Sequence, residues 1–174
     1  MKGLPSFKLQ FDPAEIPGLA AAYLQDGKDD DEKALASGRR IALGAGTVEN
    51  LKIIYTWKTR GRGITRLLRN RPAEIADALK LAVEAEEERS AIAVLCGLHG
   101  VNVPIASAIM TAIKPDRYTV IDFRVLQALG TDTPDRSVDF YLAYLGYCRN
   151  LVGQSGVSMR DLDRALWQWS KNVP

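Results

Sequence analysis

One carboxylate in this chain stands where a side chain can do chemistry. Asp122 follows a short apolar run formed by Tyr118, Val120 and Ile121, and a helical pattern begins directly after it. An aspartate in this position is an ordinary helix N-cap, because its side chain accepts hydrogen bonds from amides of the first turn. The helix N-terminus also favours the ionised form. With Val120, Ile121 and Phe123 expected to exclude bulk water, an ionised carboxylate here can also stabilise a developing cation or deprotonate water.

A basic stretch lies in the first half of the chain. Its cationic residues are Lys58, Arg60, Arg62, Arg66, Arg69 and Arg71, with no acid among them. Acidic residues gather instead at 26–32 and 84–88, so a chain of net charge +2 can still present a basic face. Such a run is either a solvated surface or a track for phosphate groups. In the same way, the loop 60–63 is either plainly solvated or a DNA contact through Arg60 and Arg62.

Lys58 closes a helical pattern that Thr47 caps and that runs over 48–59. Helical spacing places it on the same face as the apolar Leu51 and Ile54 and as Tyr55. Two interpretations stay open. Lys58 can extend to solvent at the helix end, where the dipole favours a cation, or it can stand at the rim of a pocket floored by Tyr55 or Trp57.

A hairpin between two helical patterns precedes Asp122. The first pattern ends near Leu98, Gly100 and Asn102 tolerate positive φ, and Pro104 suits the first turn of the next helix. Ala106, Ile109, Met110 and Ile113 follow at helical spacing. A hairpin of this kind points several free amides at one place, which suits a phosphate oxygen.

These residues resemble a known family. Leu98–Ala106, LHGVNVPIA, is similar to the helix-hairpin-helix pattern Leu-x-Gly-Val-Gly-x-x-x-Ala. The segment 120–125 resembles the loop that carries the catalytic aspartate in the helix-hairpin-helix (HhH-GPD) DNA glycosylases of the endonuclease III superfamily, and the spacing between the two parts also matches. The resemblance covers the stretch from Leu95 to Gly130.

The resemblance implies an all-α, two-lobed glycosylase-like fold, with Asp122 as the catalytic carboxylate. It also implies that hairpin amides bind the DNA backbone, with a monovalent cation at the hairpin backbone as in relatives, and that the target base is flipped into a pocket between the lobes. The implied backbone-binding residues are Gly100, Val101, Asn102, Val103, Ile105 and Ala106. The pocket or DNA candidates are Tyr55, Trp57, Lys58, Arg60, Arg62, Tyr118 and Arg124.

The chain departs from the family pattern at three places. Asn102 replaces the second hairpin glycine, and Pro104 stands where bifunctional members carry a lysine nucleophile. The cysteine quartet of the iron–sulfur branch is missing, since the chain holds only Cys96 and Cys148, which we expect to be buried free thiols. We therefore expect no cofactor, no iron–sulfur cluster and a monofunctional enzyme in which water is the nucleophile. Lys58 is the one candidate substitute for the missing lysine.

Length and composition limit the number of domains, the class of protein and the chemistry that the chain can support. The chain has 174 residues, 47% of them hydrophobic, which suits a single compact unit with its own core. No apolar run approaches a membrane span and no signal peptide opens the sequence, so we expect a cytoplasmic monomer with no membrane partner. The single histidine, His99, disfavours most histidine-based catalysis and zinc chemistry.

The helical patterns order the remainder of the chain. Phe7, Leu9 and Phe11 alternate in an arm that we expect to lie on the body, and Asp12 begins a helix predicted to stop near Gly27. A second helix is predicted from a solvated acidic start at 29–32 to about Leu43. By resemblance, one lobe comprises 47–132, with the helix-hairpin-helix at about 90–114, and the other combines 1–46 with 133–174.

Three classes of function remain. The leading one is DNA repair by base excision, with hydrolytic removal of a damaged or modified base from double-stranded DNA through Asp122. The rival is a non-catalytic helix-hairpin-helix DNA-binding protein that uses Asp122 only as a cap, and the third is a helical protein-interaction domain. Both DNA-binding classes require the basic stretch and the hairpin to share one face. Catalysis also requires a cleft at Asp122 deep enough for a base.

Overall fold

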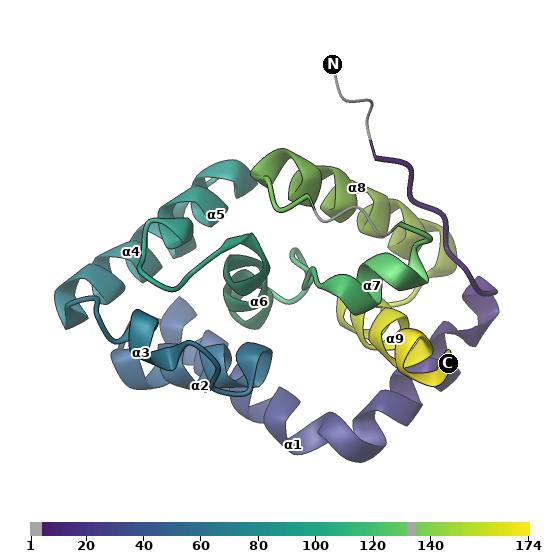
Figure 1. Cartoon of the computed structure of the whole chain (residues 1–174), viewed down its shortest axis with the longest axis horizontal. Coiled ribbons are helices and arrows are strands. Elements are labelled where there is room, and N and C mark those ends of the chain that lie inside the picture. Colours follow the sequence, from purple (N-terminus) through teal and green to yellow (C-terminus); the bar gives the residue numbers. More distant parts are fainter. Residues whose placement is uncertain (1–4, 132–134) are drawn as a thin grey trace.

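The computed structural model describes residues 5–131 and 135–174, and over these ranges the chain forms helices and no strand, which confirms the all-α prediction. Figure 1 shows α6 near the centre of the molecule, with the other long helices around it. A short 3-10 turn, η1, covers Pro13–Glu15. The helices are α1 (Ile16–Ala42), α2 (Val48–Thr59), α3 (Ile64–Leu67), α4 (Pro72–Glu84), α5 (Glu88–Cys96), α6 (Val103–Ile113), α7 (Phe123–Ala128), α8 (Val138–Ser155) and α9 (Met159–Asn172).

Helix α1 is one continuous helix, so the predicted break at Gly27 was wrong. The ring of Tyr23 packs over this glycine: a Cβ built at Gly27 would lie 3.2 Å from Tyr23 Cε1. One turn further on, Asp31 is fully buried and forms ion pairs with Arg160 and Arg164 of α9. The expectation of a solvated acidic helix start therefore fails at Asp31, because contacts with a distant helix hold this segment in place.

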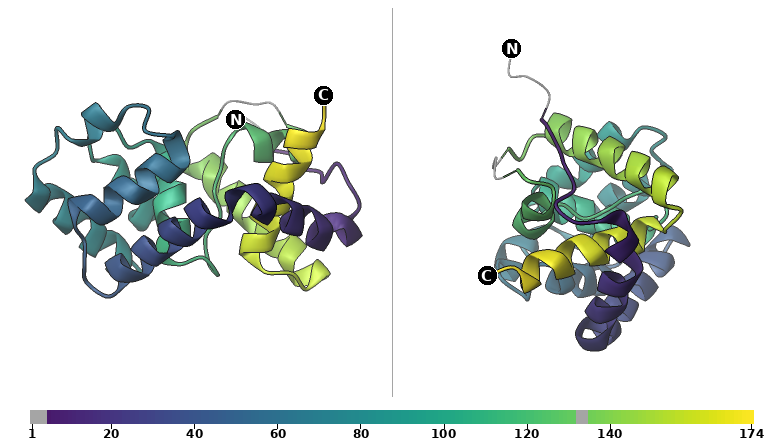
Figure 2. Two further views of the ribbon diagram at one scale, coloured as in Figure 1. Left: turned by 90° about the horizontal axis from the view of Figure 1, so that it is seen from below. Right: turned by 90° about the vertical axis from the view of Figure 1, so that its right-hand side faces the viewer.

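Helix α1 joins the two sides of the molecule. It packs against α9 along one part of its length and against α2 and α6 along another, and Figure 2 shows it running across the molecule. The approach to α6 is very close at Gly38, where a Cβ would lie 1.8 Å from the carbonyl oxygen of Ala112. Glycine is thus required there by backbone-to-backbone packing.

The contacts of α7 cross the predicted lobe boundary. This helix belongs to the predicted 47–132 lobe, yet it packs against α9. The boundary itself, at 132–133, falls outside the described residues, and the division into lobes stays a prediction.

The N-terminal arm packs on the body, as predicted for Phe7, Leu9 and Phe11. Its backbone reaches the end of α7: the N–H of Lys8 donates to the carbonyl of Leu129 at 2.9 Å, and that of Gln10 donates to the carbonyl of Ala128 at 3.0 Å. These bonds satisfy carbonyls that a helix end otherwise leaves free. The arm therefore fixes the C-terminal end of the helix that Asp122 begins.

Within the described part of the chain, no helix combines the length and the apolar composition needed to cross a membrane.

Candidate functional site

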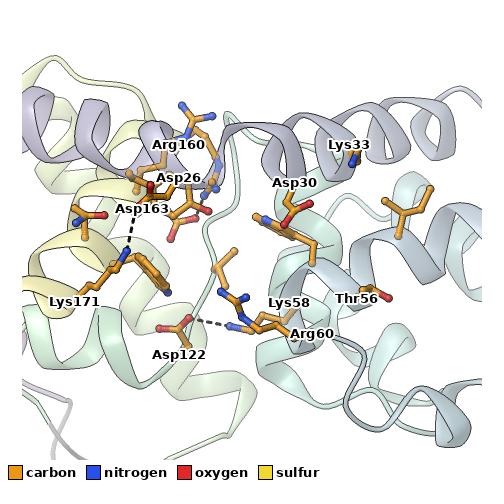
Figure 3. Close-up of a pocket in the computed structure, with 18 of the residues that line it drawn as sticks. Asp26, Asp30, Lys33, Thr56, Lys58, Arg60, Asp122, Arg160, Asp163 and Lys171 are labelled. Atoms are coloured by element: carbon orange, nitrogen blue, oxygen red, sulfur yellow. Dashed lines mark hydrogen bonds and ion pairs between the residues drawn. The ribbon is translucent and has the colours of Figure 1, made fainter.

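A cleft of about 900 Å³ is lined by α1, α2, α9 and the segment that leads into α7. Its size lies within the range of about 300–1,000 Å³ that small-molecule pockets occupy, and it is large enough for a nucleobase. Figure 3 shows Lys58 and Asp122 facing each other across it. The lining aromatic residues are Tyr23, Trp57 and Trp167, and the lining charged residues are Asp26, Asp30, Lys33, Glu49, Lys52, Lys58, Arg60, Asp122, Arg160, Asp163, Arg164 and Lys171.

Asp122 serves the helix and the cleft with different oxygens. Its Oδ1 accepts hydrogen bonds from the N–H groups of Arg124, at 3.0 Å, and Val125, at 3.1 Å, and so caps α7. Its Oδ2 faces Lys58 Nζ at 3.1 Å, and the side chain is 23% exposed. Asp122 is therefore both the N-cap of α7 and a carboxylate of the cleft, two roles that the sequence left as alternatives.

Lys58 extends into the cleft. Its ammonium group donates to Asp122 Oδ2 and, at 3.2 Å, to the carbonyl oxygen of Ile121. Only 12% of the side chain is exposed, so it does not extend to solvent. Of the two interpretations left open by the sequence, the structure favours the lysine in the pocket.

Two predicted pocket residues lie elsewhere. Trp57 and Arg60 line the cleft, but Tyr55 and Tyr118 are buried in the core. The hydroxyl of Tyr55 donates to the carbonyls of Gly63, at 3.2 Å, and Gly100, at 3.1 Å, because its side of α2 faces the hairpin and not the cleft. Desolvation by burial raises the pKa of both tyrosines.

The two remaining candidates sit outside the lining. Arg62 is exposed, and its Nε donates to the carbonyl of Thr59 at 3.2 Å. The guanidinium carbon of Arg124 lies 5.0 Å from the ring centroid of Trp167, which does line the cleft. Arg124 therefore contacts a residue of the cleft wall without lining the cleft itself.

Sequence reasoning missed a buried charge cluster beside the cleft. Arg160 pairs with Asp31 and Asp163, and Arg164 pairs with Asp31. The guanidinium of Arg160 also lies over the ring of Trp57, at 5.2 Å from its centroid. Burial raises the pKa of Asp163 to about 6, against the opposing effect of Arg160. The helical spacing of 160, 163, 164 and 167 is the signal that could have placed these residues on one face.

The hairpin is held by side chains from outside it. Gly100 has φ +79°, and a Cβ there would lie 2.8 Å from the amide nitrogen of Leu67. The amide of Asn70 donates to the carbonyl of His99 at 3.0 Å and accepts from the N–H of the same residue at 2.9 Å. Asn102 has φ −112°, so no glycine is needed there, and its side chain caps α6 by accepting from the N–H of Ile105.

Only part of the predicted set of hairpin amides is available to a ligand. The N–H of Val101 donates to the carbonyl of Leu98, and Asn102 accepts from the N–H groups of Ile105 and Ala106. Within residues 5–131 and 135–174 the structure shows no acceptor for the remaining three hairpin N–H groups. These belong to Gly100, Asn102 and Val103.

The basic segment after α2 packs against the hairpin. Tyr55 joins Gly63 to Gly100, and Asn70 joins the end of this segment to His99. Arg60 lines the cleft from the same segment. The contacts thus bring basic residues, hairpin and cleft together. Among the described residues, no three His, Cys, Asp or Glu side chains gather as a metal site would require.

No protein-family model and no curated protein matches the chain. Among solved structures, the chain is similar to the 8-oxoguanine glycosylase/lyase of Methanocaldococcus jannaschii, crystallised in complex with a 15mer DNA containing 8-oxoguanine. The TM-score is 0.47 and the sequence identity 16%, over 91% of this chain and 92% of that one.

Proposed function

We propose that this protein is a helix-hairpin-helix DNA glycosylase that hydrolyses the N-glycosidic bond of a damaged or modified base in double-stranded DNA. The observation that carries the proposal is the position of Asp122, which holds one carboxylate oxygen against α7 and presents the other to a cleft of about 900 Å³. The resemblance of 98–106 and 120–125 to the glycosylase motifs supports the same assignment.

The chemistry requires one carboxylate beside the sugar. When the bond between C1′ and the base nitrogen breaks, its electron pair leaves with the base and positive charge develops on the sugar, as in glycoside hydrolysis. The ionised Asp122 stabilises that charge and directs a water molecule to C1′, accepting the proton that the water loses. The capping bonds hold the carboxylate still during this step.

Backbone binding follows from the hairpin and the basic segment packed against it. The free amides of Gly100, Asn102 and Val103 suit one phosphate group, and Arg66, which lies beside Gly100, supplies positive charge near it. Arg60 supplies positive charge at the cleft. In this arrangement the flipped nucleotide enters the cleft between Trp57 and Trp167.

The test is detection of abasic sites after incubation with a panel of duplexes that carry damaged or modified bases. Asp122→Asn keeps the capping acceptor and removes the charge, so base release should fall by orders of magnitude while duplex binding persists. Asp116→Asn, an exposed aspartate outside the cleft, is the matched control. Wild-type excision rates in Asp122→Asn would leave this residue as a cap only. Duplex binding without excision of any base by the wild type would favour the non-catalytic binder.

The monofunctional assignment rests on Pro104, which offers no nucleophile, so the product should be an intact strand with an abasic site. One observation favours a second candidate activity, strand cleavage at that site: the Lys58 amine lies 3.1 Å from Asp122. Such an amine can condense with the C1′ aldehyde, releasing water and forming an imine. Loss of a C2′ proton then expels the 3′-phosphate.

Borohydride trapping separates the two candidates. A covalent adduct formed by the wild type and by Lys80→Ala, a control outside the cleft, but absent in Lys58→Ala, would establish strand cleavage through Lys58. A wild type that excises bases without forming an adduct is monofunctional.

A further inference from the structure

The residue after Asp122 is a large apolar side chain in the open. Phe123 is 71% exposed, contrary to the expectation that it shields the carboxylate from water. It is the first residue of α7, and its side chain leaves the body of the protein where the cleft carboxylate stands. Single exposed apolar residues are common and need no explanation by themselves, so the exposure matters only with what surrounds the ring.

The ring of Phe123 is held in place by a stack of side chains. The guanidinium carbon of Arg124 lies 5.1 Å from the Phe123 ring centroid and 5.0 Å from that of Trp167. Lys171 Nζ lies 5.7 Å from the same tryptophan centroid. Cations at these distances are attracted to ring faces. The stack therefore links the exposed ring of Phe123 to Trp167 in the cleft wall through the guanidinium of Arg124.

The element that carries this ring is fixed at both ends. Asp122 caps its N-terminus, and the N-terminal arm bonds to the carbonyls of Ala128 and Leu129. The hydroxyl of Ser170 on α9 also donates to Gln127 Oε1 at 2.6 Å. A ring on such an element can press against a ligand without being displaced.

The position of Phe123 agrees with a contact beside the reacting nucleotide. Phe123 directly follows Asp122, which lines the cleft, and its ring is exposed. If Asp122 faces the sugar of the extruded nucleotide, the exposed ring on the next residue is placed to contact the duplex beside the gap that the extruded base leaves. Proteins that deform DNA insert phenylalanine in this way, and aromatic rings stack on any base.

We propose that Phe123 stacks against DNA at the gap left by the extruded nucleotide, with Arg124 and Trp167 holding the ring in position. This inference rests on the proposed function. Phe123 contacts DNA bases regardless of their identity and contributes to affinity for distorted duplexes, not to the bond-breaking step.

The test compares binding to a duplex that carries a tetrahydrofuran abasic analogue (the abasic duplex) with binding to the same duplex that has an intact base pair at that position. We expect Phe123→Ala to reduce the wild-type preference for the abasic duplex about ten-fold, which is the size expected for one lost stacking contact. Phe123→Trp should retain the preference. Leu43→Ala, another exposed apolar residue at 89% exposure and outside the cleft, should behave as the wild type. Thermal unfolding checks that every variant is folded.

The outcomes separate this inference from the proposed function. If Phe123→Ala keeps the wild-type preference, the stacking role is wrong, whether or not the protein excises bases. If the preference depends on Phe123 but no base is excised, the stacking role holds and the catalytic assignment fails. A wild type that shows no preference for the abasic duplex overturns the stacking role. A wild type that binds no duplex overturns both the stacking role and the proposed function.

Discussion

At the scale of single residues, Asp122 divides its two oxygens between structure and cleft. Oδ1 accepts from two backbone amides, and Oδ2 faces Lys58. Substitutions can therefore separate the two roles. Because asparagine retains an oxygen that can cap α7 and alanine does not, Asp122→Ala should be less stable than Asp122→Asn by about 1 kcal/mol. Urea unfolding measures the difference, and equal stabilities would contradict the cap.

Asp31 shows how much a buried charge depends on its partners. It is fully buried and pairs with both Arg160 and Arg164. Asp31→Asn removes one counter-charge from the buried Arg160 and from the half-buried Arg164, which keep Asp163 and Asp161 as ion-pair partners. The free energy of unfolding should therefore fall by about 3 kcal/mol. Asp29→Asn, exposed on the same helix, should change it by less than about 0.5 kcal/mol. A small effect at Asp31 would mean that the cluster is hydrated.

The raised pKa of the buried Asp163 should make the free energy of unfolding depend on pH. Burial raises its pKa from 3.8 to about 6 in the folded protein, so the folded state binds this proton more tightly than the unfolded chain does. Its contribution to stability is therefore complete below pH 3.8 and is lost as the pH rises through about 6. The pKa of Asp31 is lowered, and its contribution has the opposite sign, being lost as the pH falls.

The measurement is the free energy of unfolding at pH 4 and at pH 7 for the wild type and for Asp163→Asn. The wild type should lose stability relative to the variant between these two values. Parallel pH profiles would show that Asp163 titrates alike in the folded and unfolded states.

At the scale of elements, the position of α1 against α6 depends on the absence of one side chain. A Cβ at Gly38 would meet the carbonyl oxygen of Ala112 at 1.8 Å, and a backbone atom cannot move aside as a side chain can. We expect Gly38→Ala to lower the free energy of unfolding by about 1–3 kcal/mol. Gly146→Ala in α8, where nothing lies within 4 Å, should raise it by up to about 1 kcal/mol through helix propensity. Equal effects would show that α1 can shift.

At the scale of the whole molecule, the proposed DNA surface combines the hairpin, the basic segment packed on it and the cleft. Duplex affinity should fall steeply with salt, because each neutralised phosphate releases counterions. Arg66→Gln should reduce the slope of log K against log salt by about 1 and weaken all duplexes alike. Lys80→Gln, outside the cleft, is the control. Binding that does not depend on salt would overturn the DNA assignment.

Much of the fold could be predicted from the sequence because it depends on residues close together in the chain. The caps at Asp12 and Thr47 and the helical patterns involve partners within about four positions. The hairpin glycine at 100 and the carboxylate that opens α7 were predicted for the same reason. Asn102 was expected to allow a positive φ, and instead it has φ −112° and caps α6. Local patterns gave a wrong prediction where contacts with a distant part of the chain decide the structure. At Gly27 the sequence predicted a helix end, but α1 packs against α9 and continues through this residue.

The candidate site depends on contacts that no local pattern encodes. Lys58 and Asp122 are 64 positions apart, and Arg160 and Asp31 are 129 apart. The sequence determined that a carboxylate caps a helix after a hairpin, because that arrangement is local. Only the tertiary structure decided that Lys58 enters the cleft and meets this carboxylate, that Tyr55 turns to the hairpin and that Phe123 faces solvent. The direction of each of those side chains is set by how the helices pack on one another, α2 and α6 against α1 and α7 against α9, and not by its neighbours in the chain.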